Sequence, residues 1–323
     1  MSYIPLVWIE TGRKLPHHLT NNILIHKEMY KDYDQYLVTD QKVPKSIAKI
    51  CKIVDLRNFN LHSSSSLLSN NINRSTSQKA FWINTTKRFF VLESFLEALA
   101  IEKVIHLESD NLLLRGDIIQ NMFSHPDWEM AFPLQAKEVG CASILLINKS
   151  KKLREFNEFV LKSWQEINQD DMSLLGKFSL NSGIKILPTW PNERYIFDPQ
   201  TYGRFLFGTD ARNNSKPYSQ RGIVDDRVGA VNPRLLDFYW ESGIKNLVVS
   251  SDKVDSVLVN IHIHSKRVPR SKAGLERMLT KDIASIKTVS WQRGVLDVRV
   301  FIERLLSWTM RRVFRKEIEF RLR

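Results

Sequence analysis

Residues 105–114 read IHLESDNLLL, an apolar stretch interrupted by two carboxylates, Glu108 and Asp110. In open α/β sheets, ligands bind outside the carboxyl ends of the strands. Side chains at positions i and i+2 point to the same side of an extended chain. Glu108 and Asp110 could therefore share one divalent cation, and a hard cation such as Mn²⁺ or Mg²⁺ prefers oxygen ligands. The spacing alone leaves one alternative open, a strand that ends in acidic turn residues without a metal.

The segments around this stretch alternate between short apolar runs and longer segments of helical periodicity. Strands are predicted at 4–9, 36–40, 50–55, 104–107, 142–147 and 257–264, and helices at 19–30, 85–100 and 151–166. Asn84 or Thr85 is the predicted N-cap of the second helix. This alternation predicts a mostly parallel sheet flanked by helices. The polar segment 62–78 is expected to be a mobile loop, either a surface insertion or an active-site lid.

A second group of polar residues lies in the late strand, whose end reads IHIHSK. His262 and His264 are expected on the same side of that strand, with Lys266 directly after it. Two imidazoles and a cation are costly on an apolar core face. Neutral imidazole is a common metal ligand, and a lysine can neutralise a phosphate. Either histidine alone could be a structural residue, whereas together with Glu108 and Asp110 these residues predict a site for a metal-bound diphosphate.

With these motifs the chain resembles bacterial nucleotide-sugar glycosyltransferases of the GT-A fold, over residues 1 to about 268. The matching segments are PLVWIETGRKLPHHL, FWINTTKRFFVLESF, KVIHLESDNLLL, FDPQTYGRFLFGTDARN and VNIHIHSK. The resemblance implies a Rossmann-like, mostly parallel sheet. It identifies Glu108-Ser109-Asp110 with the family's Asp-x-Asp motif, in which Asp110 is the safer ligand of Mn²⁺ or Mg²⁺. His264 and Lys266 match the family's late His and Lys best, and His262 is the competing ligand.

The resemblance also implies where the donor binds. In this fold the first strand cradles the base and ribose, which points to Trp8, Ile9, Glu10 and Thr11, and Asp40 ends the next strand. Arg88 matches an arginine that faces the donor from the preceding helix, although a solvated helix position is an equal alternative. Ala142 and Ser143 match a strand of small residues beside the donor sugar, and ordinary strand packing is the alternative there.

A base must deprotonate the acceptor hydroxyl if the reaction inverts the anomeric centre. Asp170 and Asp171 are the first candidates, because their segment resembles the acidic start of an acceptor-side helix. Two acids favoured by a helix dipole are the alternative. Asp198 is the rival base, and the pair at 225–226 is expected in a solvated loop. The sequence does not decide between inversion and retention.

The chain of 323 residues has a net charge of +13, and +10 of it lies in residues 264–323. The nearly balanced remainder argues against a broad nucleic-acid-binding face. Residues 294–323 have the pattern of a basic amphipathic helix, which could lie on an anionic membrane or pack on the domain. There is no apolar run long enough for a spanning helix, the N-terminus lacks a signal-peptide pattern, and two cysteines make no disulfide framework. We therefore expect a cytoplasmic protein, associated with the inner face of the membrane if the tail binds lipid.

These patterns predict a GT-A catalytic domain at 1–268 and a basic helical extension at 269–323. The expected activity is metal-dependent transfer of a hexosyl or N-acetylhexosaminyl group from a UDP-sugar. The expected acceptor is a glycan or lipid-linked glycan of a bacterial surface polysaccharide, as in capsule or lipopolysaccharide. A nucleotide-sugar hydrolase or phosphosugar transferase is the rival enzyme. The rival of another class is a basic membrane- or nucleic-acid-binding adaptor with a degenerate site.

Overall fold

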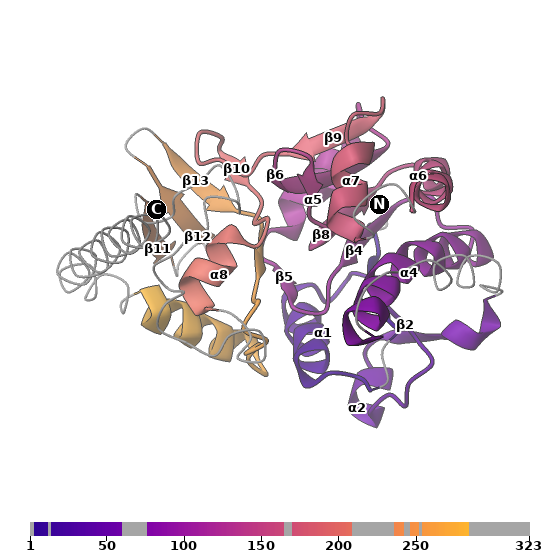
Figure 1. Cartoon of the computed structure of the whole chain (residues 1–323). Coiled ribbons are helices and arrows are strands. Elements are labelled where there is room, and N and C mark those ends of the chain that lie inside the picture. Colours follow the sequence, from indigo (N-terminus) through magenta and orange to yellow (C-terminus); the bar gives the residue numbers. More distant parts are fainter. Residues whose placement is uncertain are drawn as a thin grey trace, which may run out of the picture. The chain divides into compact units, whose positions relative to one another are not determined.

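The computed structural model describes residues 3–11, 14–59, 76–164, 170–208, 236–241, 246–251 and 254–283 (Figure 1). Within it, residues 1–278 form one compact unit. The predicted boundary at 268/269 stays a prediction. The predicted tail helix at 294–323 and the acidic pair at 225–226 lie outside the described residues, as does most of the predicted loop at 62–78.

An eight-stranded mixed sheet forms the centre of this unit, with strand order β3-β2-β1-β4-β8-β6-β7 and β9 paired to β6. Its strands are β1 (Leu6–Glu10), β2 (Gln35–Thr39), β3 (Lys52–Asp55), β4 (Val104–Leu107), β6 (Met130–Ala136), β7 (Val139–Gly140), β8 (Ile144–Ile147) and β9 (Ile184–Leu187). β1 pairs in parallel with both β2 and β4, so that Leu6 lies opposite Gln35 and Ile105. The predicted mostly parallel sheet is confirmed, with β8 and β7 as its antiparallel members.

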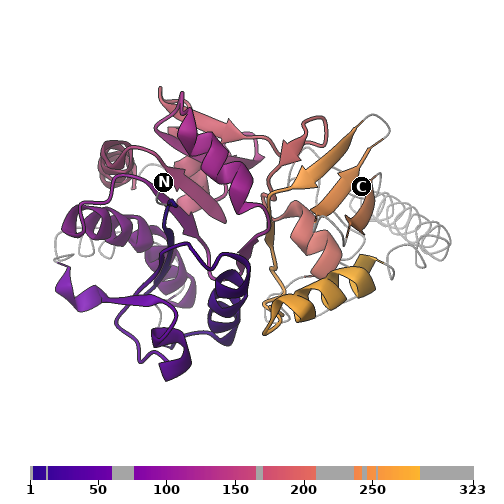
Figure 2. The ribbon, with the colours of Figure 1, turned by 180° about the vertical axis from the view of Figure 1, so that it is seen from behind.

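Helices cover both faces of the sheet (Figures 1 and 2). In the described part of the chain the helices include α1 (His17–Met29), α2 (Lys45–Ala48), the 3₁₀ turn Leu56–Asn58, α4 (Thr76–Ala98), α5 (Gly116–Ser124), α6 (Ser150–Ser163), α7 (Asp171–Phe178) and α8 (Thr201–Phe207). α4, α6 and α7 pack with Val7 and Leu145 in one apolar core. α1, α2 and α5 pack with Leu6 and Trp8 in another. Neighbouring residues of β1 thus contribute to opposite cores, as the two-residue period of a strand requires.

A second, four-stranded sheet has the order β10-β13-β12-β11 and follows the large sheet in the chain. Its strands are β10 (Tyr195–Ile196), β11 (Asp237–Glu241), β12 (Asn246–Ser250) and β13 (Asp255–Leu258). The short strand β14 (Asn260–His262) pairs with β5 (Asn111–Leu113). The prediction of one strand over 257–264 was wrong, because the chain leaves the second sheet at Val259. The N–H of Val259 donates to Ile196 of β10, whereas its carbonyl accepts from Leu114, directly after β5.

α4 begins at Thr76, nine residues before the predicted start. Asn84 and Thr85 are therefore inside the helix, and neither is its N-cap. The first residues of α4, 76–78, belong to the polar segment 62–78, whose composition shows no helical periodicity. The longer helix brings further side chains, Phe81 and Trp82 among them, to the lining of a cavity.

Candidate active site

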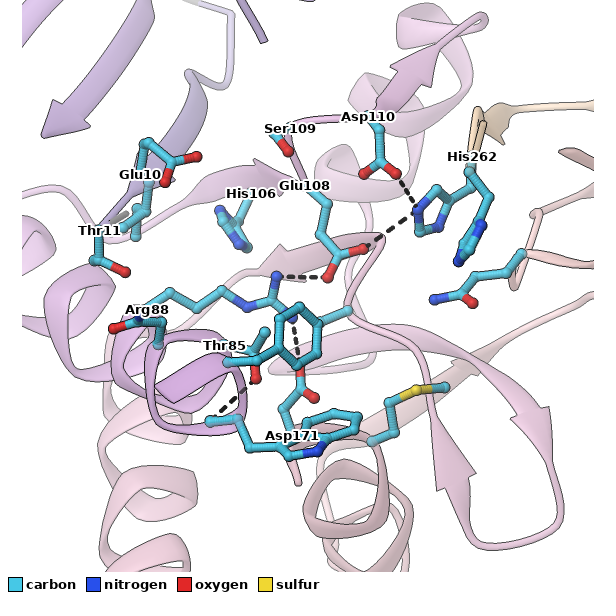
Figure 3. A pocket seen from close by; sticks show the side chains of 18 of the residues that line it. Glu10, Thr11, Thr85, Arg88, His106, Glu108, Ser109, Asp110, Asp171 and His262 are labelled. Atoms are coloured by element: carbon cyan, nitrogen blue, oxygen red, sulfur yellow. Dashed lines mark hydrogen bonds and ion pairs between the residues drawn. The ribbon is translucent and has the colours of Figure 1, made fainter. Parts of the chain in front are cut away.

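A cavity of about 510 Å³ lies at the carboxyl ends of β1 and β4 (Figure 3). β1 contributes Ile9 and Glu10, and the 108–110 turn follows β4. α4 and α7 supply further wall residues, as do the segments that follow β14 and precede α8. The lining residues are Ile9, Glu10, Thr11, Phe81, Trp82, Asn84, Thr85, Arg88, His106, Glu108, Ser109, Asp110, Ala142, Asp171, Met172, Gln200, His262, His264 and Lys266.

Asp110 is the centre of a cluster of charged groups at one end of this cavity. Its Oδ2 lies 2.8 Å from Nε2 of His262, and Nζ of Lys266 donates to the same oxygen. Oε2 of Glu108 lies 3.8 Å from the same Nε2. The structure therefore brings together the two predicted carboxylates, His262 and Lys266. His264 lies in the turn after β14, where it lines the pocket with its ring 5.9 Å from that of His262.

The charges of this cluster shift one another's pKa values. Burial disfavours the ionised form of Asp110, but His262 and Lys266 outweigh it and hold the pKa of that carboxyl far below its usual range. Burial also disfavours the charged imidazole of His262, yet Asp110 raises its pKa to about 10. Burial lowers the pKa of His264 to about 4, and the charge of His262 acts in the same direction. At neutral pH, His264 is therefore neutral, whereas His262 is protonated and paired with the Asp110 carboxylate.

The turn that carries the carboxylates is held by buried hydrogen bonds from α1. Nδ2 of Asn22 donates to the carbonyls of Ser109 and Asn111, at 3.0 and 2.9 Å. Nε2 of His18 lies 3.0 Å from Oγ of Ser109. Nδ2 of Asn111 in turn donates to the carbonyl of Ser143 on the neighbouring segment. The predicted site residues Ser109 and Ser143 are thus parts of one network, and Asn22 was not expected there, although a buried Asn on an apolar helix face is a recognisable signal.

Arg88 lies between two carboxylates from different elements. Its guanidinium donates to Oε1 of Glu108 and to Oδ2 of Asp171, both at 2.5 Å. Burial opposes ionisation of Glu108, but Arg88 and His262 lower its pKa. Burial raises the pKa of Asp171 to about 6 in spite of Arg88. Arg88 is therefore a buried site residue and not a solvated one, and the alternative considered for it from sequence is excluded.

Two of the three candidate bases are placed outside the cavity lining. Asp170 is the N-cap of α7, and its Oδ1 accepts the N–H of Ser173 at 2.8 Å. Asp198 is completely buried and accepts backbone N–H groups from Tyr202, Gly203 and His262. Burial raises the pKa of Asp198. Asp170 and Asp198 thus lie outside the cavity lining, and Asp171 is the candidate that faces the cavity.

The predicted nucleoside residues divide between the cavity and the core. Ile9, Glu10 and Thr11 line the cavity. Trp8 does not, because its side chain is fully buried on the opposite face of β1 and packs edge-on against His26, with ring centroids 5.2 Å apart. Asp40 is exposed, lies outside the cavity lining and accepts a hydrogen bond from Gln41. Neither Trp8 nor Asp40 is among the residues that line this cavity.

Among the cavity residues that were not expected from sequence are His106 and Gln200. His106 is buried in β4, and its Nδ1 lies 3.1 Å from the carbonyl of Val7. Burial lowers the pKa of His106 to about 3, with a further contribution from Arg88, so the imidazole is neutral. Gln200 lies before α8 with a left-handed backbone, at φ 82°. Residues other than glycine rarely adopt this backbone conformation, and those that do often lie in functional segments.

Glu108, Asp110 and His262 could hold a divalent cation. One ligand atom from each lies within 4.8 Å of the others, and all three residues face the same end of the cavity. Two carboxylates and one imidazole suit Mn²⁺, and the carboxylates alone suit Mg²⁺. His262 would have to lose the proton that it holds toward Asp110 before it could bind the cation, because an imidazole ligates metals in its neutral form.

No protein-family model matches the chain, and no curated protein matches its sequence. Comparison with solved structures returns several glycosyltransferases. WbbM, a bifunctional glycosyltransferase, is 12% identical with a TM-score of 0.39, over 61% of this chain and 40% of that one. The galactosyltransferase LgtC, in complex with donor and acceptor sugar analogs, is 14% identical with a TM-score of 0.38, over 71% and 89%.

Mouse xyloside xylosyltransferase 1 is 11% identical with a TM-score of 0.41, over 62% of this chain and 89% of that one. The chain thus spans less than half of the WbbM structure that it matches.

Proposed function

We propose that this chain is a metal-dependent glycosyltransferase that transfers a sugar from a nucleoside diphosphate donor, with uridine as the base. The observation that carries the proposal is the convergence of Glu108, Asp110, His262 and Lys266 at one end of the cavity. These residues come from segments about 150 positions apart in the sequence. A structural role alone does not explain two carboxylates, an imidazole and an ammonium group around one opening.

The reaction forms a bond between the acceptor oxygen and the anomeric carbon, and breaks the bond from that carbon to the β-phosphate oxygen. The electron pair leaves with the nucleoside diphosphate, and the acceptor proton goes to a base or to the departing phosphate. When bound, the cation would neutralise the charge that develops on the diphosphate. Lys266 supplies a second positive charge beside Asp110, where such a diphosphate would lie.

Arg88 and Asp171 act at the other side of the carboxylate turn. Arg88 holds Glu108 in one orientation through a charge-assisted hydrogen bond. Asp171 faces the cavity, and its pKa of about 6 lies closer to neutral pH than the pKa of an ordinary aspartate. If the anomeric centre is inverted, Asp171 is the residue that we assign as base.

The cellular role that we propose is synthesis of a bacterial surface polysaccharide, on a glycan or lipid-linked acceptor at the cytoplasmic face of the membrane. It rests on the sequence resemblance and on the basic residues of 264–323. The structure adds one fact, that no helix in the described part of the chain has the length and apolarity to cross a bilayer.

Thermal unfolding with UDP, GDP or CMP, each with and without Mn²⁺, tests the proposal. A ligand that binds only the folded state stabilises it by about 2.7 kcal/mol at a hundred times its dissociation constant. We expect stabilisation by UDP that requires Mn²⁺ and is lost in Asp110→Asn. The matched control is Asp127→Asn, which removes an exposed carboxylate outside the cavity.

If none of the nucleotides stabilises the wild-type protein, the glycosyltransferase proposal fails. Salt-dependent binding of anionic vesicles or nucleic acid without any effect of metal would then favour the adaptor. If UDP and Mn²⁺ bind and a UDP-sugar is cleaved equally fast with and without glycan acceptors, the hydrolase is favoured.

A further inference from the structure

α4 presents a row of side chains to the cavity, and their character changes along the helix. Arg88, Thr85 and Trp82 follow one another at intervals of three residues, which places them on one face. At about 1.5 Å per residue, Trp82 lies about 9 Å along the helix axis from Arg88. The cavity therefore has a charged end at Arg88 and Asp110, and a second end toward the start of α4.

The second end is uncharged and aromatic among the described lining residues. It consists of Phe81, Trp82 and Asn84 from α4, and Met172 from α7, which we call the aromatic rim. Phe81 is 57% exposed, although it is one of the largest apolar residues in the described chain. Its ring meets that of Trp82 edge to face, with centroids 5.0 Å apart. Trp82 is half-buried, so the pair presents one exposed and one half-buried ring beside the cavity, which indicates a binding surface.

We propose that the aromatic rim binds the acceptor, and that the group bound there is a neutral pyranose ring. This inference rests on the proposed function and names the acceptor side of the same site. One face of a pyranose carries several C–H groups, which pack well on aromatic rings, while its hydroxyls project from the ring edge. The amide of Asn84 can donate and accept hydrogen bonds at that edge. The hydroxyl of Thr85 lies about one helical turn beyond Trp82, toward the charged end of the cavity.

The charge distribution favours a neutral acceptor ring over a phosphate. Among the described lining residues the cations are Arg88, Lys266 and protonated His262, and each is paired with a carboxylate at the charged end. The aromatic rim offers no cation among its own residues. The separation along α4 also leaves room for the transferred sugar between the diphosphate end and an acceptor stacked on Trp82.

Binding of simple glycosides to the protein saturated with UDP and Mg²⁺ tests this inference. Saturation-transfer NMR with methyl β-D-glucopyranoside, methyl β-D-galactopyranoside and methyl N-acetyl-β-D-glucosaminide measures affinity and identifies the protons in contact. We expect at least one glycoside to bind, with strongest transfer to the C–H protons of one ring face. Trp82→Ala and Phe81→Ala should each weaken that binding about tenfold and leave UDP affinity unchanged.

Trp190→Ala is the matched control, because Trp190 is 43% exposed and lies outside the cavity lining. The inference is overturned if no glycoside binds, or if the rim variants bind glycoside as the control does. Loss of UDP affinity in Trp82→Ala would assign the rim to the nucleobase and also overturn it. Binding of octyl β-D-glucopyranoside alone would assign the rim to an apolar aglycone. Failure of UDP to bind the wild type with Mg²⁺ or Mn²⁺ would remove the proposed function itself, and this inference with it.

Discussion

The carboxylate of Asp198 accepts the backbone N–H of His262 at 2.9 Å, across 64 positions of sequence. The same carboxylate accepts the N–H groups of Tyr202 and Gly203 at the start of α8. A fully buried acid thus joins α8 to the strand that carries the imidazole of the candidate metal site. Its geometry explains why His262 faces Asp110 in one fixed orientation.

Asp198→Asn should destabilise the fold and loosen His262. An asparagine amide has one accepting oxygen in place of two, so at least one buried N–H loses its partner. The expected loss is about 3 kcal/mol in the free energy of unfolding, measured by urea denaturation. Affinity for Mn²⁺ should fall in the same variant, whereas the exposed change Asp127→Asn should alter neither quantity. Unchanged stability in Asp198→Asn would show that the three hydrogen bonds are not needed.

Gly203→Ala should disturb the same contact between α8 and β14, this time through a change on the helix. A Cβ on Gly203 would lie 1.9 Å from the carbonyl oxygen of His262, so the helix or the strand must move. We expect a loss of about 2–3 kcal/mol in stability. Gly208→Ala is the comparison, because a Cβ there meets nothing within 4 Å and only the left-handed backbone, at φ 75°, is unfavourable. If both alanine variants lose equal stability, the close approach at Gly203 is not what limits the packing.

Local sequence patterns predicted the core of the large sheet well. The runs that became β1, β2 and β4 are apolar and end in polar residues, a pattern that depends on neighbouring residues only. The second sheet was missed, because β10 has two residues and β11 pairs with β12 through contacts that leave no periodic signal. The end of β13 was missed for the same reason, since Val259 leaves its sheet to meet residues far away in sequence.

The candidate site was likewise predicted only where local sequence patterns indicate it. The sequence indicated Glu108, Asp110 and the late histidines from their spacing, and the structure places both carboxylates beside His262. The side-chain direction of Trp8 was not predicted, although the alternation along β1 already separates it from Ile9. The ion pair of Arg88 with Asp171 and the hydrogen bond from His262 to Asp198 join residues more than 60 positions apart, which no local pattern contains.

Acid should weaken the fold through His26. Its Nε2 accepts the N–H of Leu113 at 3.0 Å, and its Nδ1 lies 2.8 Å from the carbonyl of Asn22. Burial lowers the pKa of His26 to about 4 from its ordinary value of 6.5. Between these values the unfolded chain binds more protons, so stability is full above pH 6.5 and falls as the pH drops toward 4. The expected contribution is about 3 kcal/mol.

Urea denaturation from pH 4 to pH 7 measures this contribution as the difference between the wild type and His26→Gln. The variant should be less stable at pH 7 and should show a smaller loss on acidification. An identical pH dependence in both proteins would mean that His26 is protonated equally in the folded and unfolded states.

Arg88→Met should be the most destabilising single change among the residues that contact the turn at 108–110. The guanidinium is buried and paired with both Glu108 and Asp171, so its removal leaves the buried Asp171 without its partner and the half-buried Glu108 with His262 alone. Breaking a buried ion pair in this way costs about 3–5 kcal/mol. The double variant Arg88→Met with Asp171→Asn should recover part of that loss, because the amide carries no charge to leave unpaired. Urea unfolding of the two single variants and the double variant gives the coupling free energy directly. If the two single losses simply add in the double variant, Arg88 and Asp171 do not stabilise each other, and Arg88 is held in the cavity by Glu108 alone.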